Sequence, residues 1–407
     1  MYKLKNINSF LVIIIISLLT IIFLLIKEKP KSLYYVEGIL TPEKKNNILD
    51  EEAQNMLNTL KSIHKTDKYF YEQLITYLSI TDSLEENKND TVKFDMKEDC
   101  YFHNVTPINI TENGDYILCQ YNSSKFVALF SKSGKFIKKY GRIGSGPGEY
   151  LEPAFCSVQN DTIFCFDNKL NKIILYSISS GQYLDDYIII NSEIFPKDFV
   201  ISPITNTALF YRIFLFNNPA VLSVYSFDTK EKKLKRIGEY GKMSDINRVS
   251  RSFQILGLAI SEHGYIFTLE PQRFGFTVFN PKGKQITSFF NYEADFFKGL
   301  NKFRKEDLLS PRKETGLFFS NSFCNFIHYL GNGIIGINVV SPNSKKSNKR
   351  FHLRYTFWSV DGFFLGSLKY DSSFIIYGKN GKLYRWTENL DKNNFYKNPS
   401  LIKTTLW

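Results

Sequence analysis

The chain has 407 residues and a formal net charge of +12, with 43% hydrophobic and 16% aromatic residues. This apolar share is enough for a sizeable buried core, and the many Phe and Tyr residues favour strands over a helical bundle. The lysines are scattered, so the basic total does not indicate a nucleic-acid partner, and the one dense basic run, 345–350, is interpreted as a solvated loop.

The N-terminal region contains an uncharged apolar run. Residues Ser9–Ile26 read SFLVIIIISLLTIIFLLI, which is 18 residues long and close to the minimum for a helix across about 30 Å of hydrocarbon. We therefore predict a transmembrane anchor over residues 1–29, and lysines on both sides leave its orientation open. The alternatives are a cleaved signal peptide, which needs small residues at a cleavage site, a lipoprotein signal, which needs a cysteine well before Cys100, and a buried core helix.

Residues 30–90 are predicted to form a linker followed by a helical stalk. Thr41-Pro42 matches an N-cap residue followed by proline at the first helical position. Apolar residues then recur at three-to-four spacing, with a break at 64–68, which indicates one or two amphipathic helices. The pattern spans too few heptads for a coiled coil, so we expect the stalk to pack on the rim of the main domain. The apolar positions are Ala53, Leu57, Leu60, Tyr71, Leu74, Ile75 and Leu78.

From Thr91 onward, short apolar runs alternate with Gly, Asn, Asp and Ser turns, and one unit recurs. Its second half is a hairpin, found at 126–141, 173–188, 222–238, 276–290 and 356–370. An apolar strand precedes each hairpin, at 114–121, 161–167, 207–214, 264–270 and 333–340, and a sixth, incomplete unit covers 374–386 and 401–407. Repeats of this kind match blades of a β-propeller, with the hairpins as outer strand pairs. We predict an all-β, six-bladed β-propeller over residues 91–407.

Two further features of the ring follow from the repeat. Closure without an exposed edge requires strands from both chain ends in one blade, so residues Thr91–Lys97 are predicted to complete the last blade. The interval between the fourth and fifth units is longer than the others by roughly 30 residues, which indicates an insertion. We place that insertion at Tyr292–Ser322, with a helix-compatible stretch at Lys302–Leu309.

The segment Tyr140–Pro153, YGRIGSGPGEYLEP, resembles a signature of the bacterial six-bladed β-propeller family, which is related to NHL-repeat and TolB-like propellers. Residues Asp161–Ile173 are similar to the NHL pattern of a strand, an Asp/Asn turn and a second strand. Family members are commonly exported, often as lipoproteins, so the resemblance implies a propeller that is periplasmic or extracellular. Combined with the predicted anchor, this indicates a single-pass protein of the cell membrane. The residues that carry the resemblance are Gly141, Arg142, Gly144, Gly146, Pro147, Gly148, Glu149, Asp167 and Asn171.

The glycine-rich loop within this signature is interpreted as a structural turn between blades. It lacks the Gly-Lys-Ser/Thr of a phosphate-binding P-loop, and no third glycine completes a dinucleotide fingerprint after Gly144 and Gly146. Arg142 and Glu149 are candidates for an ion pair across the turn. A ligand-binding loop is the alternative.

No motif for catalysis or metal binding stands out. His64, His103, His263, His328 and His352 are isolated, with a turn position expected for His263, and no metal or cofactor is predicted. The five cysteines follow no C-x-x-C pattern, and a Cys156–Cys165 disulfide stays open. Metal-dependent hydrolases with six-bladed propellers use carboxylates at the central tunnel. Here the candidates would be Glu112, Asp161, Asp167, Glu270 and Asp361.

Two functions are therefore carried forward. The first is a membrane-tethered binding or scaffold module for a protein, peptide or glycan, which follows from the repeats, the apolar N-terminus and the missing catalytic motifs. The second is a metal-dependent hydrolase or lactonase acting at the central tunnel. The sequence leaves enzymatic activity open and favours the binding role, without nucleic acid as a partner.

Overall fold

The computed structural model describes residues 51–63, 72, 74–76, 78, 91–95, 108–120, 124–189, 196, 198–211, 221–241, 257–269, 273–291, 294, 296–297, 322–342, 351–370, 375–390 and 396–406. The predicted anchor at 1–29 lies outside this set, as does the helix-compatible stretch at 302–309. Within the described ranges, no helix combines the length and apolar character needed to span a bilayer.

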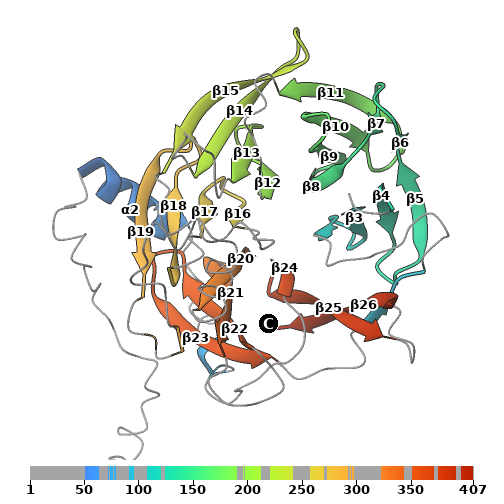
Figure 1. Ribbon diagram of the computed structural model, residues 1–407. Coiled ribbons are helices and arrows are strands. Elements are labelled where there is room, and N and C mark those ends of the chain that lie inside the picture. Colours follow the sequence, from blue (N-terminus) through green and yellow to red (C-terminus); the bar gives the residue numbers. More distant parts are fainter. Residues whose placement is uncertain are drawn as a thin grey trace, which may run out of the picture.

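The described strands form six four-stranded antiparallel blades around a central axis (Figure 1). Blades 2 and 3 are joined into one eight-stranded sheet, because their outermost strands β11 and β15 pair in parallel at Ile188–Ile189 and Lys233–Leu234. Blade 1 holds β2 (Ile108–Ile110), β3 (Tyr116–Gln120), β4 (Phe126–Phe130) and β5 (Phe136–Tyr140), and blade 2 holds β8 (Pro153–Gln159), β9 (Thr162–Asp167), β10 (Lys172–Ser177) and β11 (Tyr183–Ile189). Blade 3 holds β12 (Asp198–Ile201), β13 (Ala208–Tyr211), β14 (Leu222–Asp228) and β15 (Lys233–Tyr240), and blade 4 holds β16 (Leu258–Ile260), β17 (Ile266–Thr268), β18 (Gly275–Phe279) and β19 (Gln285–Phe290). Blade 5 holds β20 (Phe323–Gly331), β21 (Ile334–Pro342), β22 (Phe351–Ser359) and β23 (Phe364–Tyr370), and blade 6 holds β24 (Ile375–Lys379), β25 (Lys382–Leu390), β26 (Tyr396–Thr405) and β1 (Thr91–Lys93).

Blade 6 combines the two ends of the domain, which confirms the predicted closure. Strand β1 pairs antiparallel with β26, with Val92 opposite Leu401. Directly after β1, the buried Phe94 ring lies 5.2 Å from the Phe130 ring of blade 1 and 5.4 Å from the Trp386 ring of blade 6. The closing strand therefore removes an exposed sheet edge and also fills the interface between the last and first blades.

The predicted hairpins are the third and fourth strands of blades 1 to 5. The strands predicted before the hairpins, such as 114–121, are the second strands of blades 1 to 5. A further strand lies inside them, nearest the axis: β2, β8, β12, β16 and β20. The unit predicted at 374–386 provides the inner hairpin β24–β25 of blade 6. The additional inner strands are short in several blades, and a three-residue strand such as β2 is too short to show an alternating pattern.

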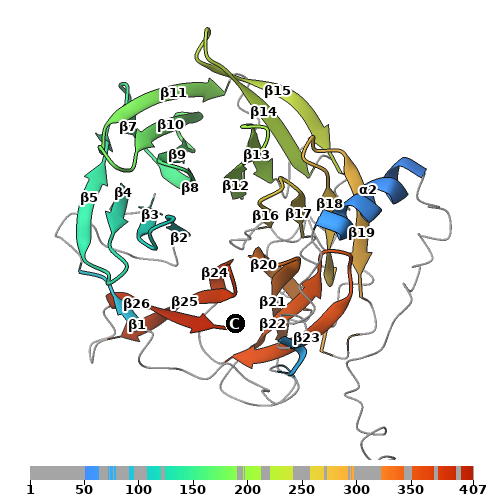
Figure 2. The same cartoon turned by 180° about the vertical axis from the view of Figure 1, so that it is seen from behind.

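Helix α2 (Glu51–Ile63) packs against the outside of blade 4, beside β19 (Figure 2). Its Leu57 and Leu60 are buried in the same apolar cluster as Phe276 and Ile286 of that blade. Further along, Leu74 is buried among side chains of blades 5 and 6. The amphipathic pattern thus positions helical segments on the propeller rim, as the sequence indicated.

Candidate functional site

A cavity of about 750 Å³ lies at the centre of the ring. Residues of β2, β8, β12, β16, β20 and β24 line it, so the innermost strand of every blade contributes to its wall. Cavities of roughly 300–1,000 Å³ are typical of sites for small ligands. The wall includes one or more residues from each blade, among them Asn109, Ser157, Asp198, Leu258, His328 and Tyr377.

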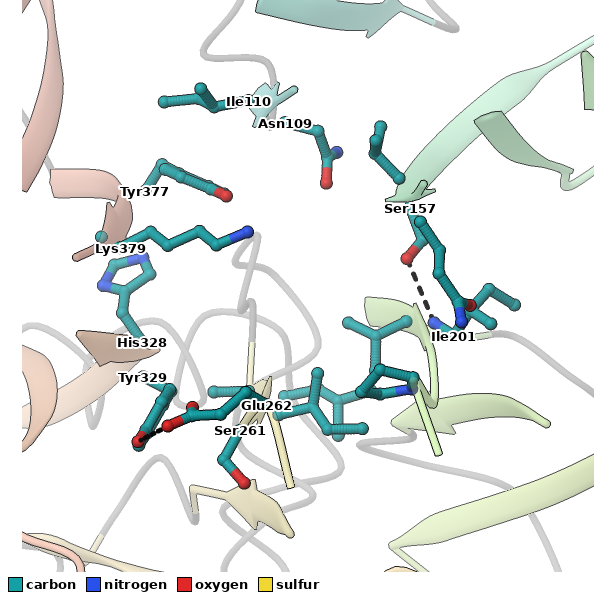
Figure 3. Close-up of a pocket in the computed structure, with 18 of the residues that line it drawn as sticks. Asn109, Ile110, Ser157, Ile201, Ser261, Glu262, His328, Tyr329, Tyr377 and Lys379 are labelled. Carbon is teal, nitrogen blue, oxygen red and sulfur yellow. Dashed lines mark hydrogen bonds between the residues drawn. The ribbon is translucent and has the colours of Figure 1, made fainter. Parts of the chain in front are cut away.

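Hydrogen bonds between neighbouring blades hold this wall together. The side chain of Asn109 donates from Nδ2 to the Cys156 carbonyl oxygen (2.8 Å), which connects blade 1 to blade 2. The backbone N–H of Ile201 donates to Ser157 Oγ (3.1 Å), which connects blade 3 to blade 2. Because Nδ2 of Asn109 is engaged with the wall, its side-chain oxygen is left toward the cavity (Figure 3).

Hydrogen bonds also connect neighbouring blades in the other half of the ring. The hydroxyl of Tyr329 in blade 5 donates to Glu262 Oε1 in blade 4 (3.0 Å; Figure 3). The backbone N–H of Gly381 in blade 6 donates to the Leu330 carbonyl oxygen in blade 5 (2.9 Å). The circumference of the cavity is therefore cross-linked between blades, which makes it a pre-organised surface.

Asp198 is a buried carboxyl group in the cavity wall, with 8% of its surface exposed. Its Oδ1 accepts from the N–H of Phe199 (2.8 Å), and its Oδ2 accepts from the N–H of Leu258 in blade 4 (3.0 Å). Burial raises the pKa of Asp198 to about 8, and this outweighs the two amide donors, which favour the charged form. At neutral pH the carboxyl is therefore mostly protonated and connects blades 3 and 4 as a neutral acid.

The turns between the first and second strands of the blades form one end of the cavity. Four of these turns place an asparagine in the left-handed region: Asn206 (φ 49°) in blade 3, and three residues of blades 2, 5 and 6, namely Asn160 (φ 49°), Asn332 (φ 52°) and Asn380 (φ 48°). Asparagine tolerates this conformation better than most residues, so the turn explains the residue type. Asn160, Asn332 and Asn380 also line the cavity, and their amide groups add donors and acceptors to its rim.

The charged groups of the cavity are few and of mixed sign. Lys379 is exposed and extends into the cavity, where Glu112 and Glu262 are the acidic counterparts (Figure 3). Beside them, the Oε1 atom of Gln159 is buried and has no hydrogen-bond partner within the described part of the chain.

His328 is the only histidine among the described lining residues. It is 7% exposed, and its Nδ1 lies 2.9 Å from the hydroxyl of Tyr355 in the same blade. Next to it, Tyr377 of blade 6 forms a hydrogen bond with the backbone of Ile110 in blade 1. Both aromatic side chains are fixed by neighbours, which rigidifies this side of the wall.

Of the carboxylates considered from the sequence, the structure places only Glu112 on the cavity. Asp161 accepts from the N–H of Ser179 (2.8 Å) and the hydroxyl of Ser177 (2.8 Å) in a turn of blade 2. Asp361 hydrogen-bonds with Ser359 in a turn of blade 5. Asp161, Asp167 and Asp361 thus hold turns and do not supply the tunnel carboxylates that the hydrolase alternative requires, while Glu270 lies outside the described residues.

Sequence reasoning missed the titratable wall residues Asp198, Glu262 and His328. They lie on or next to innermost strands that the repeat pattern did not show, and no local motif surrounds them. His263, adjacent to Glu262, lies in the turn where it was expected. His352 is exposed on β22, and His64 and His103 lie outside the described residues.

The glycine-rich signature lies between blades 1 and 2. Strands β6 (Arg142–Ile143) and β7 (Glu149–Tyr150) pair in parallel across the loop. The predicted ion pair forms, with Arg142 Nε 2.6 Å from Glu149 Oε1, and Glu149 Oε2 accepts from the N–H of Gly146 (2.8 Å). These two donors hold the pKa of Glu149 below its usual range. Gly141 (φ 60°) and Gly148 (φ 67°) provide the left-handed residues at the two ends of the loop, which includes Gly144 and Pro147.

Asp167 anchors the same loop to blade 2. Its Oδ2 accepts from the N–H groups of Leu151 (2.5 Å) and Glu152 (2.9 Å). Its Oδ1 accepts from the N–H groups of Lys169 (2.9 Å) and Leu170 (2.7 Å). One fully buried carboxylate thus organises both the end of the loop and the turn that follows β9.

Two further contacts complete this turn region. Asn171 adopts a left-handed conformation (φ 49°), and its carbonyl oxygen accepts from the N–H of Ile189 (2.8 Å). The hydroxyl of Tyr176 donates to the Gly148 carbonyl oxygen (3.0 Å). None of the nine signature residues lines the axial cavity, so this geometry describes a connection between blades.

The described part of the chain has no group of three or more His, Cys, Asp or Glu side chains placed to hold a metal ion. Cys119, Cys156, Cys165 and Cys324 are buried free thiols.

Comparison with known families agrees with this architecture. Residues 90–295, just over half of the chain, match the model of the DUF5128 family, described as a 6-bladed beta-propeller. The chain belongs to this family. No curated protein matches it significantly.

Solved structures similar to this DUF5128 member share the propeller fold at low identity. One is a protein from Bacteroides fragilis described as exported, with 11% identity and a TM-score of 0.54, covering 80% of this chain and 98% of that one. Another is a member of the DUF4221 family from Bacteroides vulgatus, with 13% identity, a TM-score of 0.54 and the same coverage. At these identities the likeness shows the fold alone.

Proposed function

We propose that this DUF5128 propeller is a membrane-tethered, extracytoplasmic binding module whose axial cavity takes a small polar ligand, most suitably part of a glycan. The observation that carries the proposal is the cavity itself, to which every blade contributes polar side chains beside aliphatic and aromatic ones. The placement outside the cytoplasm is supported by the apolar run at 9–26 and by the description of a structural neighbour as exported.

The chemistry of the wall favours a neutral, hydroxyl-rich ligand. Amide groups at Asn109, Asn160, Asn332 and Asn380 both donate and accept hydrogen bonds, as sugar hydroxyls do. Although the whole chain carries a net charge of +12, the cavity does not share this excess, so an anionic polymer is not selected there.

A peptide remains the second class of ligand to be tested, because amides also match peptide groups. A metal-dependent hydrolase finds no three-residue ligand set in the described part of the chain. Hydrolysis of a bound glycan, ester or lactone is therefore included as an outcome to be measured and is not part of the proposal.

The full chain, purified in detergent and fluorescently labelled, is applied to glycan and peptide arrays, and hits are measured by calorimetry. Lys379→Met removes the charged group that extends into the cavity, whereas Lys282→Met changes an exposed lysine in the β18–β19 turn and is the matched control. We expect a saturable glycan hit whose affinity falls about tenfold in Lys379→Met and is unchanged in Lys282→Met. Absence of a saturable hit, or equal affinity in both variants, would refute the proposal.

A further inference from the structure

Three buried cysteines meet at the interface between blades 1 and 2. Cys119 lies on β3, Cys156 on β8 and Cys165 on β9, and all three belong to one apolar cluster. Their exposed surface is 2%, 6% and 0%, respectively. The Cys156 thiol lies between the other two, with hydrogen bonds to both, and Cys156 also lines the axial cavity.

The strand register defines how two of these thiols face each other. Gln159 pairs with Thr162 across the two-residue turn 160–161, which makes them the hydrogen-bonded pair next to the turn. Hydrogen-bonded and non-hydrogen-bonded pairs alternate along an antiparallel ladder. Counting away from the turn, Cys156–Cys165 is the third pair after Gln159–Thr162, and by this alternation it is a non-hydrogen-bonded pair.

The geometry of such a pair is compatible with a covalent bond. Cα atoms of non-hydrogen-bonded pairs lie about 4.5 Å apart, and both side chains point to the same face of the sheet. Disulfides connect Cα atoms separated by about 4.4–6.8 Å. No backbone movement is therefore required to join the two sulfur atoms.

We propose that Cys156 and Cys165 form a cross-strand disulfide when the propeller meets a disulfide-bearing oxidant, and that Cys119 stays a thiol. The bond would cross-link the inner hairpin of blade 2 behind the cavity wall. This inference is independent of the ligand proposed for the cavity.

The reaction balances with a small-molecule disulfide or an oxidised thiol–disulfide exchange protein as the co-reactant. The Cys156 thiolate attacks one sulfur of the oxidant, which forms a mixed disulfide and releases one thiolate. The Cys165 thiolate then attacks the Cys156 sulfur, which forms the new S–S bond and releases the second thiolate. The two protons lost from the protein thiols end on the two released groups, so the oxidant is reduced by two electrons.

The surroundings also predict that the reaction is slow in the folded protein. Burial raises the pKa values of the Cys156 and Cys165 thiols, which lowers the fraction of reactive thiolate at neutral pH. Cys156 is one of the residues that line the cavity, whereas Cys165 is fully buried and does not line it. Cys156 is therefore expected to be attacked first.

The test uses the full chain in detergent, purified under reducing conditions and then incubated with oxidised glutathione at about pH 8.5, near the pKa of an ordinary thiol. Remaining thiols are alkylated in denaturant, and proteolytic peptides are identified by mass spectrometry before and after reduction. Cys165→Ser and Cys119→Ser are treated in parallel, with circular dichroism to confirm that each variant is folded. A sample isolated from cells without reductant gives the state formed during synthesis.

The proposal predicts a Cys156–Cys165 linked peptide pair in the wild type and in Cys119→Ser, and none in Cys165→Ser. The oxidised wild type should also melt about 2–5 °C higher than its reduced form. Four alkylated thiols at the described cysteines after oxidation would overturn the proposal. Linkage of Cys156 only to Cys119 or to Cys100 would overturn it as well.

Discussion

Val92 of β1 lies opposite Leu401 of β26, so the first and last strands of the domain are neighbours in blade 6. The axial cavity depends on this pairing, because its wall is formed by all six innermost strands and the closed ring holds these strands in position. The contacts that close the ring are therefore the first to test.

Replacing Phe94 with Ala should destabilise the propeller by about 3 kcal/mol, because it leaves a cavity between blades 1 and 6. The Phe94 side chain is 3% exposed and packs on the rings of Tyr116, Phe130 and Trp386. Lys93→Ala, at an exposed position on the same strand, should change stability by less than about 0.5 kcal/mol. Equal urea midpoints for the two variants would show that the N-terminal strand does not hold the ring closed.

Asp167→Ala should destabilise by about 2–4 kcal/mol, because four backbone N–H groups lose a buried acceptor. Lys169→Ala keeps the backbone N–H that Asp167 accepts and is the control, with an expected change below about 0.5 kcal/mol. Chemical denaturation of both variants measures the difference. A loss below about 1 kcal/mol for Asp167→Ala would mean that water satisfies these amides equally well.

The stability of the propeller should fall between about pH 5 and pH 9 because of Asp198. Its pKa is raised from 3.8 to about 8 in the folded state, so the folded state holds this proton more tightly than the unfolded chain does. The resulting stabilisation is complete below the unfolded pKa and is lost as the pH rises through the folded pKa, with a size on the order of a few kcal/mol.

Asp198→Asn removes this titration. The variant loses one amide hydrogen bond and is expected to start from a lower stability, so the slope with pH is the quantity to compare. We expect a clearly shallower slope for Asp198→Asn between pH 5 and pH 9, measured by thermal melting in matched buffers. Parallel slopes for the two proteins would show that the buried carboxyl does not titrate in this window.

The predicted membrane anchor can be tested by extraction with alkaline carbonate. The wild-type chain should remain in the membrane pellet, since the run at 9–26 is long enough to span the bilayer. Ile15→Arg combined with Leu19→Arg introduces charges that each cost about 2.5–3.5 kcal/mol near the centre of a membrane helix, so this variant should be released. Release of the wild type would contradict anchoring, as would retention of the double variant.

The outer half of each blade could be predicted from sequence because it depends on local signals. Hairpins such as 126–141 combine a short apolar run with a glycine turn, and Gly134 adopts the positive φ that its turn requires. The ring closure followed from the general need to remove sheet edges. The hairpin signals are visible within one repeat, whereas closure follows from a requirement on the whole ring.

The inner wall of the cavity could not be predicted because it depends on contacts between blades and not on local sequence signals. Asp198 and Leu258 come from different blades, and their hydrogen bond depends on the packing of two complete sheets. No characteristic turn in the sequence marks the short strands β12 and β16. In the sequence alone, the buried aspartate at the start of β12 cannot be told from an ordinary strand-end residue. Convergence around an axis is a property of the ring and is absent from any single repeat.

Filling the axial cavity is the most direct test of its proposed role. Ile260→Trp places a bulky ring in the cavity wall, and Ile137→Trp places the same ring on the outer strand β5, where the residue is 46% exposed. If the cavity is the binding site, Ile260→Trp reduces ligand affinity at least about tenfold while its melting temperature stays close to that of Ile137→Trp, which binds normally. Unchanged binding by Ile260→Trp would contradict the account.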